Sequence, residues 1–173
     1  MRNHILFMAL SVFSAQAEIS RLAALSMIET GNDDHAVGGA GEVSRFQIKP
    51  WIWRQYNQSG AYTNRRISTE VAGNHLAALR DTFHKCSGRA PSDFDIYVLW
   101  NAGPTYYARI GFAKSRVHPV IRDRARRFAN LCQINDATMA QASLPKVPVV
   151  PQPPAVNANA PGQDLSLPSQ EEN

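Results

Sequence analysis

The chain has 173 residues, of which 18 are Lys or Arg and 14 are Asp or Glu, so its formal net charge is +4. After its two compositionally distinct ends are set aside, this length is enough for one compact domain with a single core. The sequence contains no internal repeat, no apolar run long enough to span a membrane, and no phosphate-binding loop, dinucleotide fingerprint or Ser-His-Asp order.

The first 17 residues have the pattern of a secretory signal peptide. Arg2 supplies positive charge, an apolar run covers residues 5–13, and small residues at 15–17 form a typical cleavage site. The apolar run is too short to remain as a membrane-spanning helix. We therefore expect an exported protein that begins near Glu18, lies in the periplasm or is secreted, and has no stable membrane insertion after cleavage.

Apolar residues at helical spacing predict a helix over residues 19–28 that ends at Glu29. Leu22 and Leu25 precede Glu29 by seven and four residues, so its carboxyl group is expected on the inward face. Burial disfavours a charged carboxylate and raises its pKa, which suits a group that donates a proton near neutral pH. The alternative is a helix-terminal Glu that turns into solvent.

The rest of the core also has mostly helical periodicity. A Gly-rich stretch at 38–41 precedes a small β element expected near 43–48. Pro50 suits the first turn of a second helix, and Ser68 is a candidate N-cap for a third. A fourth helix is expected to stop at Gly103.

The spacing of Val117, Ile121, Phe128 and Leu131 predicts a last helix. The order of elements predicts an all-α domain over residues 18–136, in which the apolar stripes of short helices pack together. Scattered Pro residues among Val, Ala, Asn, Gln and Ser predict a disordered tail over 137–173. Such a tail could tether the domain or contact a partner protein.

Cys86 and Cys132 are the only cysteines, and each lies near the end of a predicted helix. In an exported protein this pair predicts one disulfide, provided that the two backbones approach, and the bond would stabilise the fold by roughly 3 to 4 kcal/mol. The His residues lack metal-ligand spacing, so we expect no metal site and no cofactor.

The densest basic cluster lies in the last predicted helix and comprises Arg122, Arg124, Arg126 and Arg127. The simplest interpretation is a solvated helix face. Because export is also expected, the sequence argues against a nucleic-acid partner.

Residues at set distances from Glu29 complete a longer pattern. Following it are Ala36, Gly41, Gln47, Ile48 and Pro50, and later the run Trp100-Asn101-Ala102-Gly103-Pro104. In this spacing the chain resembles the lytic transglycosylase domain of the lysozyme-like superfamily. That family's pattern leads from a catalytic Glu through Gly-Ala-x-Gly-Leu-Met-Gln-Ile-x-Pro to Tyr-Asn-Ala-Gly. The resemblance covers residues 19–110.

The resemblance implies cleavage of the β-1,4 bond between N-acetylmuramic acid and N-acetylglucosamine in peptidoglycan glycan strands. In that family one Glu acts first as acid and then as base, and the muramyl 6-hydroxyl attacks to give a 1,6-anhydro product. Glu29 is expected in this role. Gln47 and Asn101 are expected to line the sugar cleft, with the backbone groups of Ala102 and Gly103 available to acetamido groups.

Several positions depart from the family's pattern. Gly38 stands where a Ser that hydrogen-bonds near the acid is usual, and Ser44 is a candidate to replace that Ser from across the loop. Trp100 stands where Tyr is usual. One or two of the aromatic residues near Asn101, Tyr106 among them, are expected to face the cleft and stack on a sugar ring.

Glu42 stands where Ala is usual and is a candidate second carboxylate. A separation of ~5 Å from Glu29 would suit a covalent intermediate, and ~6.5 to 9.5 Å would suit a water activated by a general base. Alternatively, Glu42 interacts with Arg45 or with a helix end, or it caps backbone amides of the Gly-rich loop. Two other functions also remain open: a lysozyme-type muramidase that uses water, and a peptidoglycan-binding module without catalysis.

Overall fold

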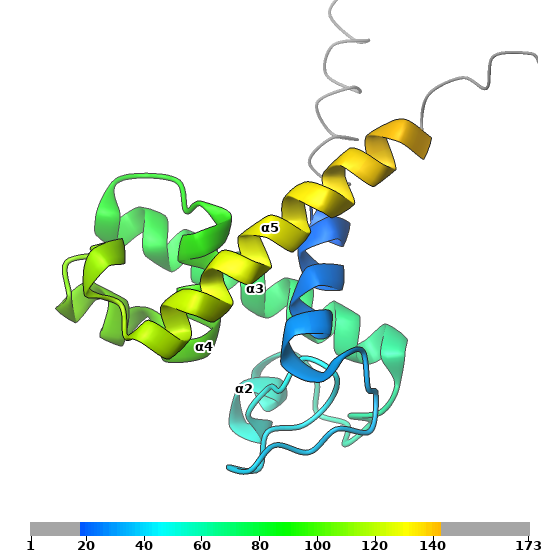
Figure 1. The fold of residues 1–173 in the computed structure, drawn as a ribbon. Coiled ribbons are helices and arrows are strands. Elements are labelled where there is room, and N and C mark those ends of the chain that lie inside the picture. Colours follow the sequence, from blue (N-terminus) through cyan, green and yellow to red (C-terminus); the bar gives the residue numbers. More distant parts are fainter. Residues whose placement is uncertain (1–17, 143–173) are drawn as a thin grey trace, which may run out of the picture.

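The computed structural model describes residues 18–142, which form a group of packed helices and one long irregular loop (Figure 1). The predicted all-α fold is confirmed. The chain is helical from residue 18 to residue 30, and the later helices are α2 (Pro50–Tyr56), α3 (Arg65–Ser87), α4 (Asp93–Arg109), the 3-10 helix η1 (Lys114–Arg116) and α5 (Pro119–Ala142).

The loop between the first helix and α2 contains the small β element that was predicted near 43–48. Val43 forms isolated bridges with Val37 and Ile48, and Val43 and Ile48 exchange two backbone hydrogen bonds of 2.9 Å. Between them, Ser44 and Gln47 both have left-handed backbone angles, with φ values of 66° and 52°. The chain therefore reverses tightly at residues 44–47 and returns to the start of α2.

The boundaries of the helices follow local chemistry. Pro50 occupies the first turn of α2, as predicted, where its missing N–H is not needed. The predicted cap of α3 is wrong: the helix begins at Arg65, and the side chain of Asn64 accepts a hydrogen bond from the Ile67 N–H at 3.1 Å. Ser68 instead lies one turn inside α3 and is buried.

Helix α4 continues past the point at which it was expected to stop, but with a kink. Gly103 has φ 82° and ψ 160°, which is not helical, and Pro104 follows it. Proline cannot donate the helical hydrogen bond and disfavours helical geometry in the residue before it. Asn101 therefore lies at the end of the first straight part of α4.

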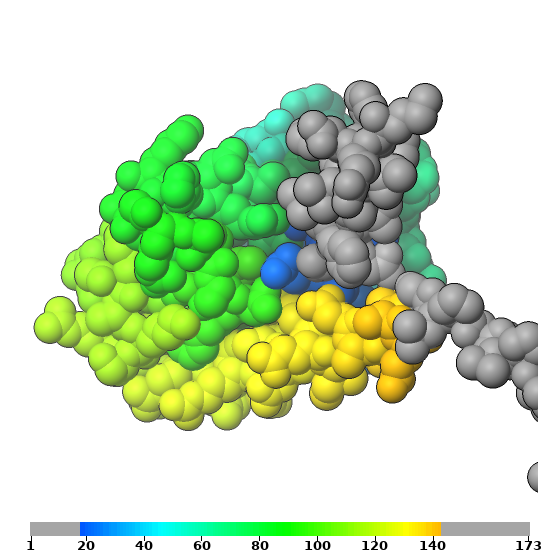
Figure 2. All heavy atoms as spheres, turned by 90° about the horizontal axis from the view of Figure 1, so that it is seen from above, coloured from blue at the N-terminus to red at the C-terminus, as the bar shows by residue number. Residues whose placement is uncertain are grey.

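The helices enclose one hydrophobic core. Helix α5 packs against α4, α4 against α3, and α3 against α2. Helix α5 also extends along one side of the molecule (Figure 2). Within residues 18–142, each of the five α-helices contributes a side chain that is at most 1% exposed, namely Leu25, Trp53, Leu76, Leu99 and Phe128. This common core fixes the relative positions of helices that are distant in sequence.

Two sequence predictions at the C-terminal side need correction. Helix α5 continues to Ala142, so residues 137–142 belong to the helix and not to a tail. The predicted disulfide is absent, because both cysteines are free. Cys86 is exposed, whereas Cys132 is buried. The Cys132 carbonyl accepts a 3.2 Å hydrogen bond from the Ser20 hydroxyl of the first helix. Burial raises the pKa of the Cys132 thiol to about 12.

The predicted signal peptide and the rest of the predicted tail lie outside the described residues. Within residues 18–142, no helix has the length and apolar character needed to cross a membrane.

Candidate active site

Glu29 lies in the last turn of the first helix, and only 7% of its side chain is exposed. The helix ends directly after it because Gly31 adopts the left-handed conformation, with φ 67°, and its N–H bonds to the Met27 carbonyl at 3.0 Å. Thr30 ties this end to the loop by donating to the Arg45 carbonyl at 2.9 Å. The inward position predicted for Glu29 is confirmed, and the solvent-facing alternative is excluded.

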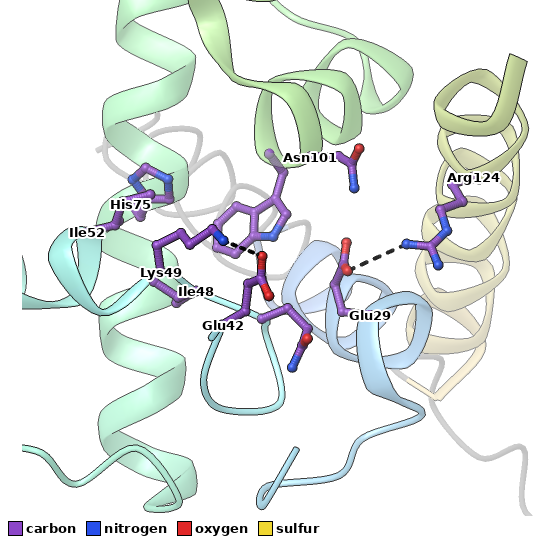
Figure 3. Close-up of a pocket in the computed structure, with 10 residues that line it drawn as sticks. Glu29, Glu42, Ile48, Lys49, Ile52, His75, Asn101 and Arg124 are labelled. Carbon is purple, nitrogen blue, oxygen red and sulfur yellow. Dashed lines mark ion pairs between the residues drawn. The ribbon is translucent and has the colours of Figure 1, made fainter. Parts of the chain in front are cut away.

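Glu29 lines a cleft of about 300 Å³ to which the loop before α2 and helices α2, α3, α4 and α5 also contribute residues (Figure 3). Glu42 and Gln47 come from the loop before α2, Asn101 from α4, and Arg124 from α5. In Figure 3 the carboxyl groups of Glu29 and Glu42 project toward the same space, with Arg124 on the side of Glu29 that is away from Glu42. Of these residues, Glu29, Glu42, Gln47 and Asn101 were selected from the sequence, and the structure shows that they line one cleft.

One hydrogen bond holds the loop beside α4. The Trp100 indole N–H donates to the Phe46 carbonyl at 3.3 Å, and Phe46 itself is buried. Gln47 follows Phe46 and Asn101 follows Trp100, so this contact places two side-chain amides on the same cleft. Amides offer both donors and acceptors, which suits a ligand that carries hydroxyl and acetamido groups.

The pKa of the Glu29 carboxyl is raised above its ordinary value, chiefly because burial disfavours its charged form. The nearby charge of Glu42 acts in the same direction, while Tyr97 and Arg124 lower the pKa. The Arg124 guanidinium lies 3.9 Å from Glu29 Oε2. Glu29 Oε1 is buried and makes no hydrogen bond to another described residue. Burial thus favours the protonated form of this carboxyl, while Tyr97 and Arg124 favour its carboxylate form.

Glu42 is an anion held by its own loop. Lys49 Nζ lies 2.6 Å from Glu42 Oε1, and the Ala40 N–H donates to Oε2 at 3.0 Å. The hydrogen bond from Lys49 is the main reason that the pKa of Glu42 is lowered. The interpretation of Glu42 as a cap of the Gly-rich loop is confirmed. The alternative in which Glu42 pairs with Arg45 is excluded, because Glu42 pairs with Lys49 and Arg45 pairs with Asp34 at 3.4 Å.

Because Gly38 has no side chain, Glu42 has room beside the cleft. A Cβ atom at position 38 would collide with the side-chain oxygens of Glu42 and Gln47. The space that a larger residue would occupy at this position is thus filled by two polar side chains from the facing loop. Glu42, and not Ser44, lies where the missing side chain would point.

Two of the expected binding residues do not reach the cleft. Ser44 is buried, and its hydroxyl accepts the Phe46 N–H at 3.3 Å. Tyr106 lies on the far part of α4 after the kink, and its hydroxyl accepts the His118 N–H at 2.9 Å. The predicted binding roles of Ser44 and Tyr106 are therefore wrong, because local hydrogen bonds direct both side chains elsewhere.

A second hollow of about 390 Å³ adjoins the first and includes Gly103 in its lining, whereas Ala102 lines neither hollow. Both hollows share Lys49, Ile52, His75, Trp100 and Asn101. They therefore form neighbouring parts of one groove.

His75 lies at the junction of these two hollows and was not found by sequence reasoning. It contacts the Tyr56 hydroxyl through Nδ1 at 3.3 Å, and its ring centroid is 5.2 Å from that of Trp100. Burial lowers the pKa of His75 to about 4, so the imidazole is neutral at pH 7. Among residues 18–142, no group of three or more His, Cys, Asp or Glu side chains could hold a metal ion.

Tyr97 and Arg124 were also not identified as site residues from the sequence, although helical spacing places each on the same face as a selected or buried residue. Tyr97 precedes Asn101 by one helical turn, and Arg124 precedes the buried Phe128 by one turn, so each shares a face with a residue that the pattern marks as inward or functional. Their approach to Glu29 depends on the packing of α4 and α5, which the spacing within one helix does not reveal.

Comparisons of the chain with protein-family models, with curated proteins and with solved structures find no match.

Proposed function

We propose that this protein is an exported lytic transglycosylase that cleaves the β-1,4 bond between N-acetylmuramic acid and N-acetylglucosamine in peptidoglycan. The observation that carries the proposal is the buried Glu29 carboxyl, which opens on a cleft shared with Gln47 and Asn101. The backbone adds support. The family's pattern has glycine at the position of Ser44, and this residue has the left-handed conformation that glycine adopts most easily.

The reaction needs one proton donor that later becomes a base. Protonated Glu29 would donate its proton to the glycosidic oxygen as the bond from that oxygen to the muramyl C1 breaks. The resulting carboxylate would accept the proton of the muramyl 6-hydroxyl as this oxygen bonds to C1 and closes the 1,6-anhydro ring. Arg124 lies close enough to stabilise the carboxylate stage. Glu42 is occupied by Lys49 and Ala40, which disfavours it as a nucleophile.

The proposal is tested with purified protein and isolated sacculi. We expect soluble muropeptides whose terminal sugar is lighter by one water than a hydrolysis product, measured by mass spectrometry. Products of full mass would instead indicate a muramidase that uses water. Sedimentation of the protein with the sacculi without soluble products would indicate a binding module without catalysis.

Replacing Glu42 by Gln should leave the rate of cleavage within about fivefold of the parent, because a partly exposed ion pair contributes little. The variant removes a negative charge that raises the Glu29 pKa, so the alkaline limb of the pH–rate profile should move to lower pH. Rates on sacculi across a pH series measure both effects. Loss of activity at every pH would show that Glu42 takes part in the chemistry.

A further inference from the structure

Arg124 differs from the other arginines of its cluster. Arg122 donates to the Ser115 carbonyl at 3.2 Å, Arg127 pairs with Asp123 at 3.1 Å, and Arg126 is exposed. Arg124 instead lines the cleft beside Glu29 (Figure 3). The interpretation of this cluster as a solvated helix face therefore does not apply to Arg124.

The Arg124 guanidinium interacts with the Tyr97 hydroxyl, but it carries five N–H donors and so retains others for a ligand. Its closest ion-pair contact, to Glu29 Oε2, is 3.9 Å long, which exceeds the length of a hydrogen bond. Its side chain is 41% exposed, so a ligand in the cleft could reach it. An arginine presents its donors in a planar fork that matches the two oxygens of a carboxylate.

The charge balance of the cleft changes when Glu29 holds the proton that it needs as an acid. Glu42 and Lys49 still neutralise each other at 2.6 Å, whereas Arg124 loses the charge of its partner. A positive charge then remains beside the reacting bond. When the substrate binds, an anionic substituent on it would neutralise the positive charge of Arg124.

We propose that Arg124 binds a carboxylate carried on the muramyl unit next to the scissile bond, so that the cleft selects acidic glycans over neutral N-acetylated glycans. The inference rests on the proposed function, because a glycan must occupy the cleft. The carboxylate belongs either to the lactyl ether of the sugar or to the stem peptide attached to it. Both sources present the same group to the guanidinium.

The test uses Glu29→Gln protein, which cannot cleave its ligand and has no charge at position 29. Fluorescence anisotropy would measure three labelled tetrasaccharides: neutral N-acetylglucosamine oligomer, a muramyl oligomer with free lactyl carboxylates, and the same oligomer with its lactyl groups amidated by a stem dipeptide. We expect at least one acidic oligomer to bind about fivefold more tightly than the neutral one, as for a partly exposed charged hydrogen bond. The tighter acidic oligomer identifies the source of the carboxylate.

Adding Arg124→Gln should abolish this preference, while adding Arg127→Gln, a matched change on the exposed side of α5, should preserve it. Equal binding of all three oligomers by the Glu29→Gln protein would overturn the inference and leave the proposed function standing. A preference that survives Arg124→Gln would overturn it as well. If no oligomer binds while thermal unfolding shows a folded protein, both the inference and the proposed function fail.

Discussion

Glu29→Gln should lower the rate of glycan cleavage by about 10² to 10⁴-fold, the usual contribution of a positioned general acid and base. The amide has nearly the same shape as the carboxyl but cannot donate a proton to the glycosidic oxygen or accept one later. The Glu29 side chain is 7% exposed, and its Oε1 makes no hydrogen bond to the described residues. An amide of the same shape therefore removes little that stabilises the fold. The loss should therefore appear in kcat and not in the yield of folded protein.

The measurement is release of soluble muropeptides from sacculi, with thermal unfolding followed in parallel. Glu70→Gln is a matched control, since Glu70 is an exposed helical residue that pairs with Arg66 at 3.4 Å, and it should retain parental activity. A Glu29→Gln protein that keeps most of its activity would remove Glu29 from the mechanism and with it the proposed function.

Much of the fold follows from patterns within single helices. Periodicity in residues 19–28 predicted both the first helix and the inward face on which Glu29 lies. The resemblance to the lytic transglycosylase pattern implied that Gln47 and Asn101 share a cleft with Glu29, and the structure brings the three residues together. The helix prediction succeeded because helical geometry is a local property of the chain, whereas the shared cleft was implied by the family's pattern and not by local geometry.

The predictions that failed depend on contacts between distant segments. The position of Arg124 beside Glu29 is set by the packing of α5, and that of Cys132 by the contact of α5 with the first helix. Ser44 was expected to act through its side chain, but its left-handed backbone turns the hydroxyl toward the Phe46 N–H. Spacing in one sequence carries no information on such three-dimensional contacts.

A second large effect concerns stability and comes from Asp95, whose side chain is fully buried at the start of α4. It accepts hydrogen bonds from Arg89 at 2.7 and 3.1 Å, from the Ser92 N–H and hydroxyl at 2.9 and 2.6 Å, and from the Tyr107 hydroxyl at 2.5 Å. Burial alone would raise the pKa of this carboxyl, but these donors outweigh burial and lower it. The network joins the start of α4 to its last turn and to the segment after α3.

Asp95→Ala should lower the free energy of unfolding at pH 7 by about 3 kcal/mol, because it leaves several buried donors without an acceptor. For a domain of this size the unfolding temperature should fall by roughly 10 °C in calorimetry. Because the pKa of Asp95 is lowered in the folded state, its carboxylate stabilises the fold at pH values above the pKa of the unfolded state. This stabilisation is lost as the pH falls, so the difference in free energy of unfolding between parent and variant should narrow below about pH 4. Asp123→Ala, a control at an exposed carboxylate paired with Arg127, should shift the free energy by less than about 0.5 kcal/mol at either pH. If the two variants proved equally stable, the Asp95 network would contribute no more to folding than a surface ion pair.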